Sequence, residues 1–397
     1  MTPPAALGRY LDACATSPPA PEVRQAMWQA EDQAWANPSS LHGFGIAAAE
    51  SLERSRCELA AGFGCAPEEL VFCSGATEAI HMALLGSAAR MEPGRLLISA
   101  VEHPATVAAA AQLAHRGWEV VSLPVDRRGV LRLEAVEPLL ATPTRLVSVI
   151  WGQSEVGAIQ PIPALGDLCR RAGIPLHVDA VQVVGHQPLR FDSLPVDLLS
   201  CTAHKLQGPR GIGALLVRAG RELDPLIGGG GQESGRRGGT EPVLLAAGFA
   251  AALELAQARL GSHQGQDQDP LATDRDRLLE RLLALPGVRL TGPSPDDPQG
   301  RLPHHISLLV EGSDGQPLPG RALVRQLWRQ GFAVSSGSAC QTGGPGTGAS
   351  AVLLAMGYGP LEAAGGLRIS LGPWVEADAL AAFPEALVQA RQALLSQ

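Results

Sequence analysis

Residues 176–205, LHVDAVQVVGHQPLRFDSLPVDLLSCTAHK, contain two short apolar runs that each end in polar residues. The first run ends at Asp179, and the second ends shortly before Lys205. Short apolar runs of this kind predict buried strands of a sheet. Because the carboxyl ends of parallel strands meet at one edge, we expect Asp179 and Lys205 to lie beside the same cleft.

Lys205 is the single lysine of the chain, since the 31 basic residues comprise this lysine and 30 arginines. A lysine can lose its proton and form a Schiff base, whereas an arginine stays protonated and is a poor nucleophile. Composition alone leaves open that Lys205 is an ordinary surface lysine. Its position after a predicted strand favours a chemical role.

Seven β-rich runs alternate with helical patterns between residues 66 and 218, which predicts an α/β fold with a mostly parallel sheet covered by helices. A polar segment, 261–269, precedes a second region that we expect to be a smaller α+β domain. We therefore predict a large domain over 17–260 and a small domain over 1–16 and 261–397. The predicted strands are 70–73, 96–99, 119–122, 146–150, 176–179, 196–200 and 213–217, then 305–310 and 367–371; the predicted helices are 77–89, one after Pro104, 275–285, 322–330 and 377–395.

The composition argues against several classes of partner. A net charge of −8 makes nucleic acid and anionic membranes unlikely partners. The most apolar stretch, 243–253, is too short to span a bilayer, and residues 1–17 lack the features of a signal peptide. Seven cysteines without a CxxC pair predict reduced thiols, a cytoplasmic location and no metal site. Buried apolar positions are expected for Cys57, Cys73, Cys169 and Cys201.

Two further segments contain residues that could bind an anion or a ring beside Asp179 and Lys205. The turn 74–78 joins a predicted strand to a helix, so its N–H groups can bind a phosphate, although an ordinary capped turn has the same pattern. His103 also follows a strand and can stack on a ring or move protons, unless it is simply structural. An amine, a carboxylate and a phosphate turn around one cleft are what pyridoxal phosphate requires.

Three segments nearer the C-terminus carry further candidates. Cys340 opens an aperiodic segment, 340–350, which favours a nucleophile on a moving loop. Arg368 lies on a predicted strand and is either a carboxylate clamp or one of many surface arginines. The glycine-rich stretch 228–240 is either a linker or a loop whose backbone closely approaches something else.

Ten motifs in the same order make the chain resemble the cysteine desulfurases, fold-type I pyridoxal-phosphate enzymes of the class V aminotransferase superfamily. The Ser-Ser-Gly-Ser-Ala-Cys form at 335–340 resembles the branch with the longer catalytic loop. The resemblance implies a seven-stranded large domain and a small domain that carries this loop. The motifs are YLD at 10–12, NPSSLH at 37–42, SGATE at 74–78, EHP at 102–104, EVG at 155–157, HVDAVQ at 177–182, AHK at 203–205, GGGQE at 229–233, SGSAC at 336–340 and LRISLG at 367–372.

The resemblance also implies a role for each matched residue. Lys205 would form the Schiff base, Asp179 would pair with the ring nitrogen, and His103 would stack on the ring and take the substrate thiol proton. Cys340 would accept sulfur from L-cysteine as a persulfide, with L-alanine as the other product, and pass it to an acceptor protein in iron–sulfur cluster assembly or other sulfur trafficking. The remaining implied contacts are Gln182 and Ser154 to the ring oxygen, Ala76, Thr77, Thr202 and His204 to the phosphate, Asn37 and Arg368 to the substrate carboxylate, and Thr240 to the phosphate of the other subunit of a homodimer.

Two departures from the family pattern bear on the chemistry. Ser154 stands where the family usually has an Asn that bonds the ring oxygen, whereas Thr202 in place of Ser keeps the hydroxyl. The change at Ser154 leaves room for a related lyase that cleaves C–S or C–Se bonds in cystine or selenocysteine. A cofactor-binding but inactive partner subunit is a further alternative, while a generic aminotransferase would give Cys340 no role.

Overall fold

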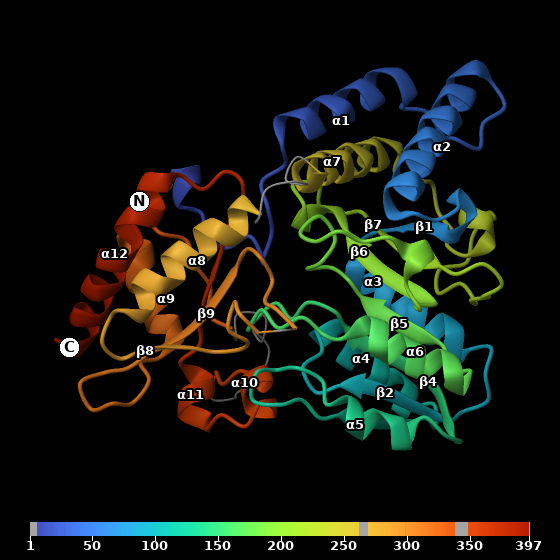
Figure 1. Ribbon diagram of the computed structural model, residues 1–397. Coiled ribbons are helices and arrows are strands. Elements are labelled where there is room, and N and C mark those ends of the chain that lie inside the picture. Colours follow the sequence, from blue (N-terminus) through green and yellow to red (C-terminus); the bar gives the residue numbers. More distant parts are fainter. Residues whose placement is uncertain (1–5, 262–268, 298, 338–347, 397) are drawn as a thin grey trace.

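A computed structural model describes residues 6–261, 269–297, 299–337 and 348–396 (Figure 1). Its larger sheet has seven strands in the order β1-β7-β6-β5-β4-β2-β3. Strands β3, β2, β4, β5 and β6 run parallel, whereas β7 is antiparallel to both β6 and β1. The predicted α/β class with a mostly parallel seven-stranded sheet is therefore confirmed. The strands are β1 (Leu70–Cys73), β2 (Arg95–Ser99), β3 (Glu119–Leu123), β4 (Thr144–Ile150), β5 (Leu176–Asp179), β6 (Leu198–Thr202) and β7 (Gly213–Val217).

Helices cover both faces of this sheet, which is why its strands are apolar throughout rather than alternating. On β4, Val147 and Val149 face one layer of core residues, while Leu146 faces the other. The first layer is built by α1 (Pro21–Ala34), α2 (Gly43–Phe63), α6 (Ile162–Ala172) and α7 (Val243–Gly261); the second by α3 (Ala76–His81), a π-helical turn (Met82–Gly86) and α4 (Pro104–Ala114); α5 (Leu133–Val136) lies in a connection.

Helix α7 corrects one expectation. The apolar run continues beyond residue 253, so the helix has 19 residues and is long and apolar enough to cross a membrane by composition. It packs against α1 and α2 (Figure 1), and Phe249 and Leu253 lie in the same core as the sheet. These contacts are those of a core helix.

A second sheet of three antiparallel strands follows in the order β10-β9-β8. Leu11, near the N-terminus, packs into the core of this sheet, and Asp12 forms a bridge with Ser370. Both ends of the chain therefore contribute to this unit, on the left of Figure 1. Its elements are α8 (Pro270–Leu283), β8 (Val288–Leu290), β9 (His305–Val310), α9 (Gly320–Arg329), α10 (Ala351–Ala355), α11 (Pro360–Ala364), β10 (Leu367–Ser370) and α12 (Ala377–Leu395).

The differences from the sequence expectations are small. Strand β6 begins at Leu198 rather than at 196, and α8 begins at Pro270, where Asp269 caps the helix by accepting from Leu271 N at 2.9 Å. Cys57 is exposed on α2, whereas the other three cysteines expected in the core are buried. Cys340 and most of the segment 261–269 lie outside the described residues.

Candidate active site

A cavity of about 560 Å³ opens at the carboxyl ends of the central strands. It brings together most of the predicted site residues, which come from the turn after β1, from the segments that follow β2, β4, β5 and β6, and from β10. The predicted residues that line it are Ala76, Thr77, His103, Ser154, Asp179, Gln182, Thr202, His204, Lys205 and Arg368.

Lys205 lies in a 3₁₀ turn (Ala203–Lys205) that follows β6 directly. Its Nζ donates to the carbonyl oxygens of Cys14 at 2.5 Å and Ala15 at 2.7 Å. Gln182 Nε2 donates to the same Cys14 carbonyl at 3.0 Å. The N-terminal segment thus fixes both side chains at the wall of the cavity.

Asp179 ends β5 and is 3% exposed. Burial raises the pKa of its carboxyl, while the charges of His103 and Lys205 and a hydrogen bond from Val181 N oppose the rise. A cation placed against this carboxyl, such as a protonated pyridine nitrogen, would stabilise its anionic form. The environment of Asp179 therefore fits the ring nitrogen of pyridoxal phosphate.

His103 caps the N-terminus of α4, and its Nδ1 accepts from Ala105 N at 3.1 Å. Burial lowers the pKa of His103, so the neutral imidazole is favoured near pH 7. With Nδ1 accepting, the ring proton of the neutral form is on Nε2. The helix cap thereby fixes both the position and the tautomer of this side chain.

The turn between β1 and α3 has the close backbone packing expected of a phosphate site. Gly75 has a φ of +151°, and a Cβ added at Gly213 would lie 2.8 Å from Gly75 Cα. Residues 74–78 line the cavity, and N–H groups at the start of a helix are suited to bind a phosphate. Thr202 Oγ1 donates to Ile212 O at 3.0 Å, and burial, with the charges of Lys205 and Arg210, lowers the pKa of His204 to about 4.

Arg368 projects from β10 into the same cavity and is 7% exposed. Nη1 donates to Ser154 O at 3.1 Å, and Nη2 donates to Asp12 Oδ1 at 2.8 Å. Its Nε is buried without a hydrogen-bond partner among the described residues. A donor left over in a guanidinium held by two other contacts fits a substrate carboxylate.

Three predicted site residues are not brought into the cavity. Asn37 lies exposed between α1 and α2, and Thr240 lies exposed after the glycine-rich stretch. Cys340, the predicted nucleophile, lies outside the described residues. Conversely, Asp12, Cys14 and Arg210 line the cavity although they were not predicted as site residues. For Asp12 the signal was present, because it ends the YLD motif.

The glycine-rich stretch 228–240 is a packed loop rather than a linker. Glu233, which is 7% exposed, receives both Nη atoms of Arg56 and the backbone N–H of Phe72. A second ion pair joins Arg237 to Glu78, beside the phosphate turn. The geometry therefore supports the interpretation that the backbone of this loop closely approaches other parts of the protein.

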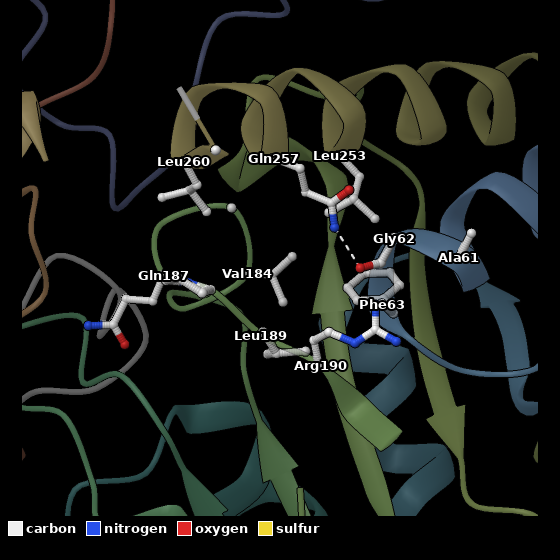
Figure 2. Close-up of a pocket in the computed structure, with 13 residues that line it drawn as sticks. Ala61, Gly62, Phe63, Val184, Gln187, Leu189, Arg190, Leu253, Gln257 and Leu260 are labelled. Carbon is white, nitrogen blue, oxygen red and sulfur yellow. Dashed lines mark hydrogen bonds between the residues drawn. The ribbon is translucent and has the colours of Figure 1, made fainter. Parts of the chain in front are cut away.

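A separate hollow of about 300 Å³ lies between the end of α2 and α7 (Figure 2). Phe63, Val184 and Leu253 line it, and Gln257 Nε2 donates to Gly62 O across its rim at 2.5 Å. Its one charged side chain is Arg190, and none of the predicted site residues faces it. The chemistry therefore belongs to the larger cavity.

Comparisons with known proteins identify the family of the chain. Residues 9–383 match the family model of class-V aminotransferases. The chain is 36% identical over 365 residues to the cysteine desulfurase IscS of Methanosarcina thermophila, covering 91% of this chain and 87% of that one. It is 39% identical over 373 residues to a cysteine desulfurase of Cereibacter sphaeroides, covering 93% and 92%. A solved NifS-like protein superposes with a TM-score of 0.86 at 31% identity, covering 98% and 99%. The chain therefore belongs to the class-V aminotransferase family and, within it, to the pyridoxal-phosphate-dependent cysteine desulfurases.

Proposed function

We propose that this protein removes sulfur from L-cysteine, releases L-alanine and holds the sulfur as a persulfide on Cys340. The observation that carries the proposal is the placement of the single lysine, whose amine shares one cavity with buried Asp179, His103 and Arg368. When bound, pyridoxal phosphate supplies an aldehyde that condenses with amines and a ring that accepts an electron pair.

The protein's own residues divide the remaining work. Arg368 binds the substrate carboxylate with the donor that its other contacts leave over. Lys205 moves the proton at the substrate Cα, and neutral His103 takes up the thiol proton. Asp179 holds the ring nitrogen in its protonated form, and the N–H groups of the turn after β1 bind the phosphate.

We further propose a homodimer. Large apolar side chains gather at the exposed edge formed by α1, α2 and the loop between them, and Leu41 at the loop is 95% exposed. Trp35 and Phe44 contact each other there with ring centroids 5.7 Å apart, and both are 64% exposed. Exposed patches of this kind mark interaction sites. Asn37 lies in the same loop, so a second subunit on this edge would give it and Thr240 a route to a cofactor that they do not reach in their own chain.

The fate of the sulfur and the location are also proposals. A persulfide is a sulfur donor only when a thiol acceptor reaches it, so we expect an acceptor protein in iron–sulfur cluster assembly or other sulfur trafficking. The name IscS of a relative and the free cysteines of the described residues support a reduced, cytoplasmic setting.

The test is product analysis with L-cysteine. We expect equimolar alanine and sulfur, and a mass increase of one sulfur on the Cys340 peptide before a reductant is added. Lys205→Arg should lose turnover and the borohydride-fixed cofactor, whereas Cys340→Ala should keep the cofactor and lose turnover. Faster reaction of cystine or selenocysteine would favour a related lyase, and a bound cofactor with no turnover on any substrate would favour an inactive partner subunit.

A further inference from the structure

Glu102 precedes His103 and joins the carboxyl ends of two neighbouring strands. Its Oε1 accepts from Ser99 Oγ at 2.5 Å, from Ser99 N at 3.3 Å and from Ile150 N at 2.8 Å. Ser99 ends β2 and Ile150 ends β4. One carboxyl oxygen therefore ties these strands together where the cavity opens, and it does so one residue away from the helix cap that orients His103.

The other oxygen of Glu102 has a different environment. Oε2 is buried and makes no hydrogen bond of normal geometry among the described residues, although the nearby buried hydroxyl of Thr106 on α4 acts to lower the pKa of Glu102. A buried anionic oxygen without donors is costly, whereas a protonated carboxyl carries no charge that needs solvation. Burial accordingly raises the pKa of Glu102 to about 8, against the opposing effects of Ser99, Ile150 and Thr106.

The charges around Glu102 act in the same direction. Ile150 is the register partner of Asp179, so the carboxyl that binds Ile150 N lies one strand away from the carboxyl of Asp179. The negative charge of Asp179 raises the pKa of Glu102 further. When two carboxyls share a site, one of them keeps its proton. Although burial raises the pKa of Asp179, the positive charge of Lys205 opposes the rise and favours its anionic form, which leaves the proton to Glu102.

We propose that Glu102 is a positioning residue that works as a neutral acid. It holds the ends of β2 and β4 together beneath His103 and leaves Asp179 as the anionic carboxyl of the pair. The inference rests on the proposed function, because the roles of His103 and Asp179 toward the cofactor belong to it. The residue itself needs no contact with substrate or cofactor.

The first test measures proton linkage in the cofactor-free protein, so it does not depend on activity. The unfolded glutamate ionises near its ordinary pKa, whereas folded Glu102 keeps its proton to about pH 8. Glu102 by itself should therefore contribute a fall in stability between about pH 5 and 8, by the linkage of one extra proton and a tenfold change in the unfolding equilibrium per pH unit. Buried histidines with lowered pKa values contribute the opposite slope below about pH 6.5, so the difference between wild type and variant is the quantity to measure. Urea midpoints at several pH values and fixed protein concentration report this slope. Glu102→Gln, which is permanently neutral, should lose one proton of linkage, while Glu58→Gln, at an exposed position of α2, is the matched control.

The second test measures positioning in the loaded protein. Glu102→Gln keeps an acceptor for Ser99 and Ile150, so at pH 7 it should bind pyridoxal phosphate within about twofold of wild type, with the same visible spectrum. Glu102→Ala removes the tie between the strands and should weaken cofactor binding at least tenfold and shift the spectrum. Parallel pH slopes of the wild type and Glu102→Gln would overturn the proposal, as would a Gln variant that binds cofactor as poorly as the Ala variant. A wild type that binds no cofactor would instead refute the proposed function, and the linkage measurement would still decide the state of Glu102.

Discussion

The buried ion pair between Arg56 and Glu233 should contribute far more to stability than the exposed arginine–carboxylate pairs of the protein surface. Glu233 accepts from Arg56 Nη1 at 2.9 Å, from Arg56 Nη2 at 2.8 Å and from Phe72 N at 2.8 Å. The two side chains are 11% and 2% exposed. Although burial lowers the pKa of Arg56, Glu233 more than compensates and raises it overall. The pair therefore stays charged in a place where neither charge is well hydrated.

The expected magnitude follows from this geometry. Two unit charges about 4 Å apart attract by about 4 kcal/mol at an effective dielectric constant of about 20. Removing one partner of a buried pair costs about 3–5 kcal/mol, because the other charge stays buried without compensation. We expect Glu233→Ala to cost about 4 kcal/mol. Glu233 has a φ of +51°, so Glu233→Gly, which relieves backbone strain, should cost about 1 kcal/mol less.

Urea unfolding of cofactor-free protein at fixed concentration measures these costs. Asp192→Ala, which breaks the exposed pair with Arg190, is the control and should leave the urea midpoint nearly unchanged. The double variant Arg56→Leu/Glu233→Leu should be destabilised by about 3 kcal/mol less than the sum of its single variants. Additive single effects, or a Glu233→Ala cost no larger than the control, would refute the reasoning.

Two further predictions concern pH and packing. Burial raises the pKa of Glu155 to about 7, while a hydrogen bond from Ser350 Oγ at 2.6 Å opposes the rise, so the contribution of Glu155 to stability is lost as pH rises from about 4.5 to 7. Ser350→Ala removes this hydrogen bond and should move the upper end of the window to higher pH, as measured by urea midpoints at several pH values. An unchanged window would contradict the assignment. Gly213→Ala places a Cβ against the Gly75 turn and should weaken pyridoxal phosphate binding at least tenfold in fluorescence titrations, whereas Gly261→Ala, with open space around it, should leave binding unchanged.

The sheet was predictable because most of its strands are short apolar runs buried on both faces, with the edge strand β3 as an exception. Such a run is recognisable without knowledge of its neighbours, and Leu70–Cys73 and Gly213–Val217 are found with the predicted bounds. The apolar pattern gives no information about backbone hydrogen bonding. The expected helix over 77–89 contains a π-helical turn at Met82–Gly86, since periodicity alone does not distinguish i→i+4 from i→i+5 bonds.

The site residues also divide into those that strand topology predicts and those whose role depends on atomic contacts. Asp179 and Lys205 were predictable because strand ends converge, a consequence of topology that needs no side-chain coordinates. The role of Glu102 was not predictable, because it depends on atomic contacts: one carboxyl oxygen accepts hydrogen bonds from Ser99 and Ile150, and the other makes none of normal geometry. Asn37 remains a prediction for a different reason, since one chain does not contain the surface that a second copy would bring.

Whether arginine or lysine is used at a position of this protein follows from whether the side chain has to lose its proton there. Arg56 places a guanidinium fork on the carboxylate of Glu233, and Arg368 divides its fork between the carboxylate of Asp12 and the carbonyl of Ser154. A fork of this kind holds its geometry and its charge in a buried setting. Lys205 instead donates to the carbonyl oxygens of Cys14 and Ala15. A carbonyl accepts an N–H from a neutral amine as well as from an ammonium, so these contacts can hold the side chain in place both before and after it loses its proton. An arginine at position 205 could make the same hydrogen bonds, yet it would remain charged and could not condense with an aldehyde, which is why the chain's one lysine is found where its sheet ends in the cavity.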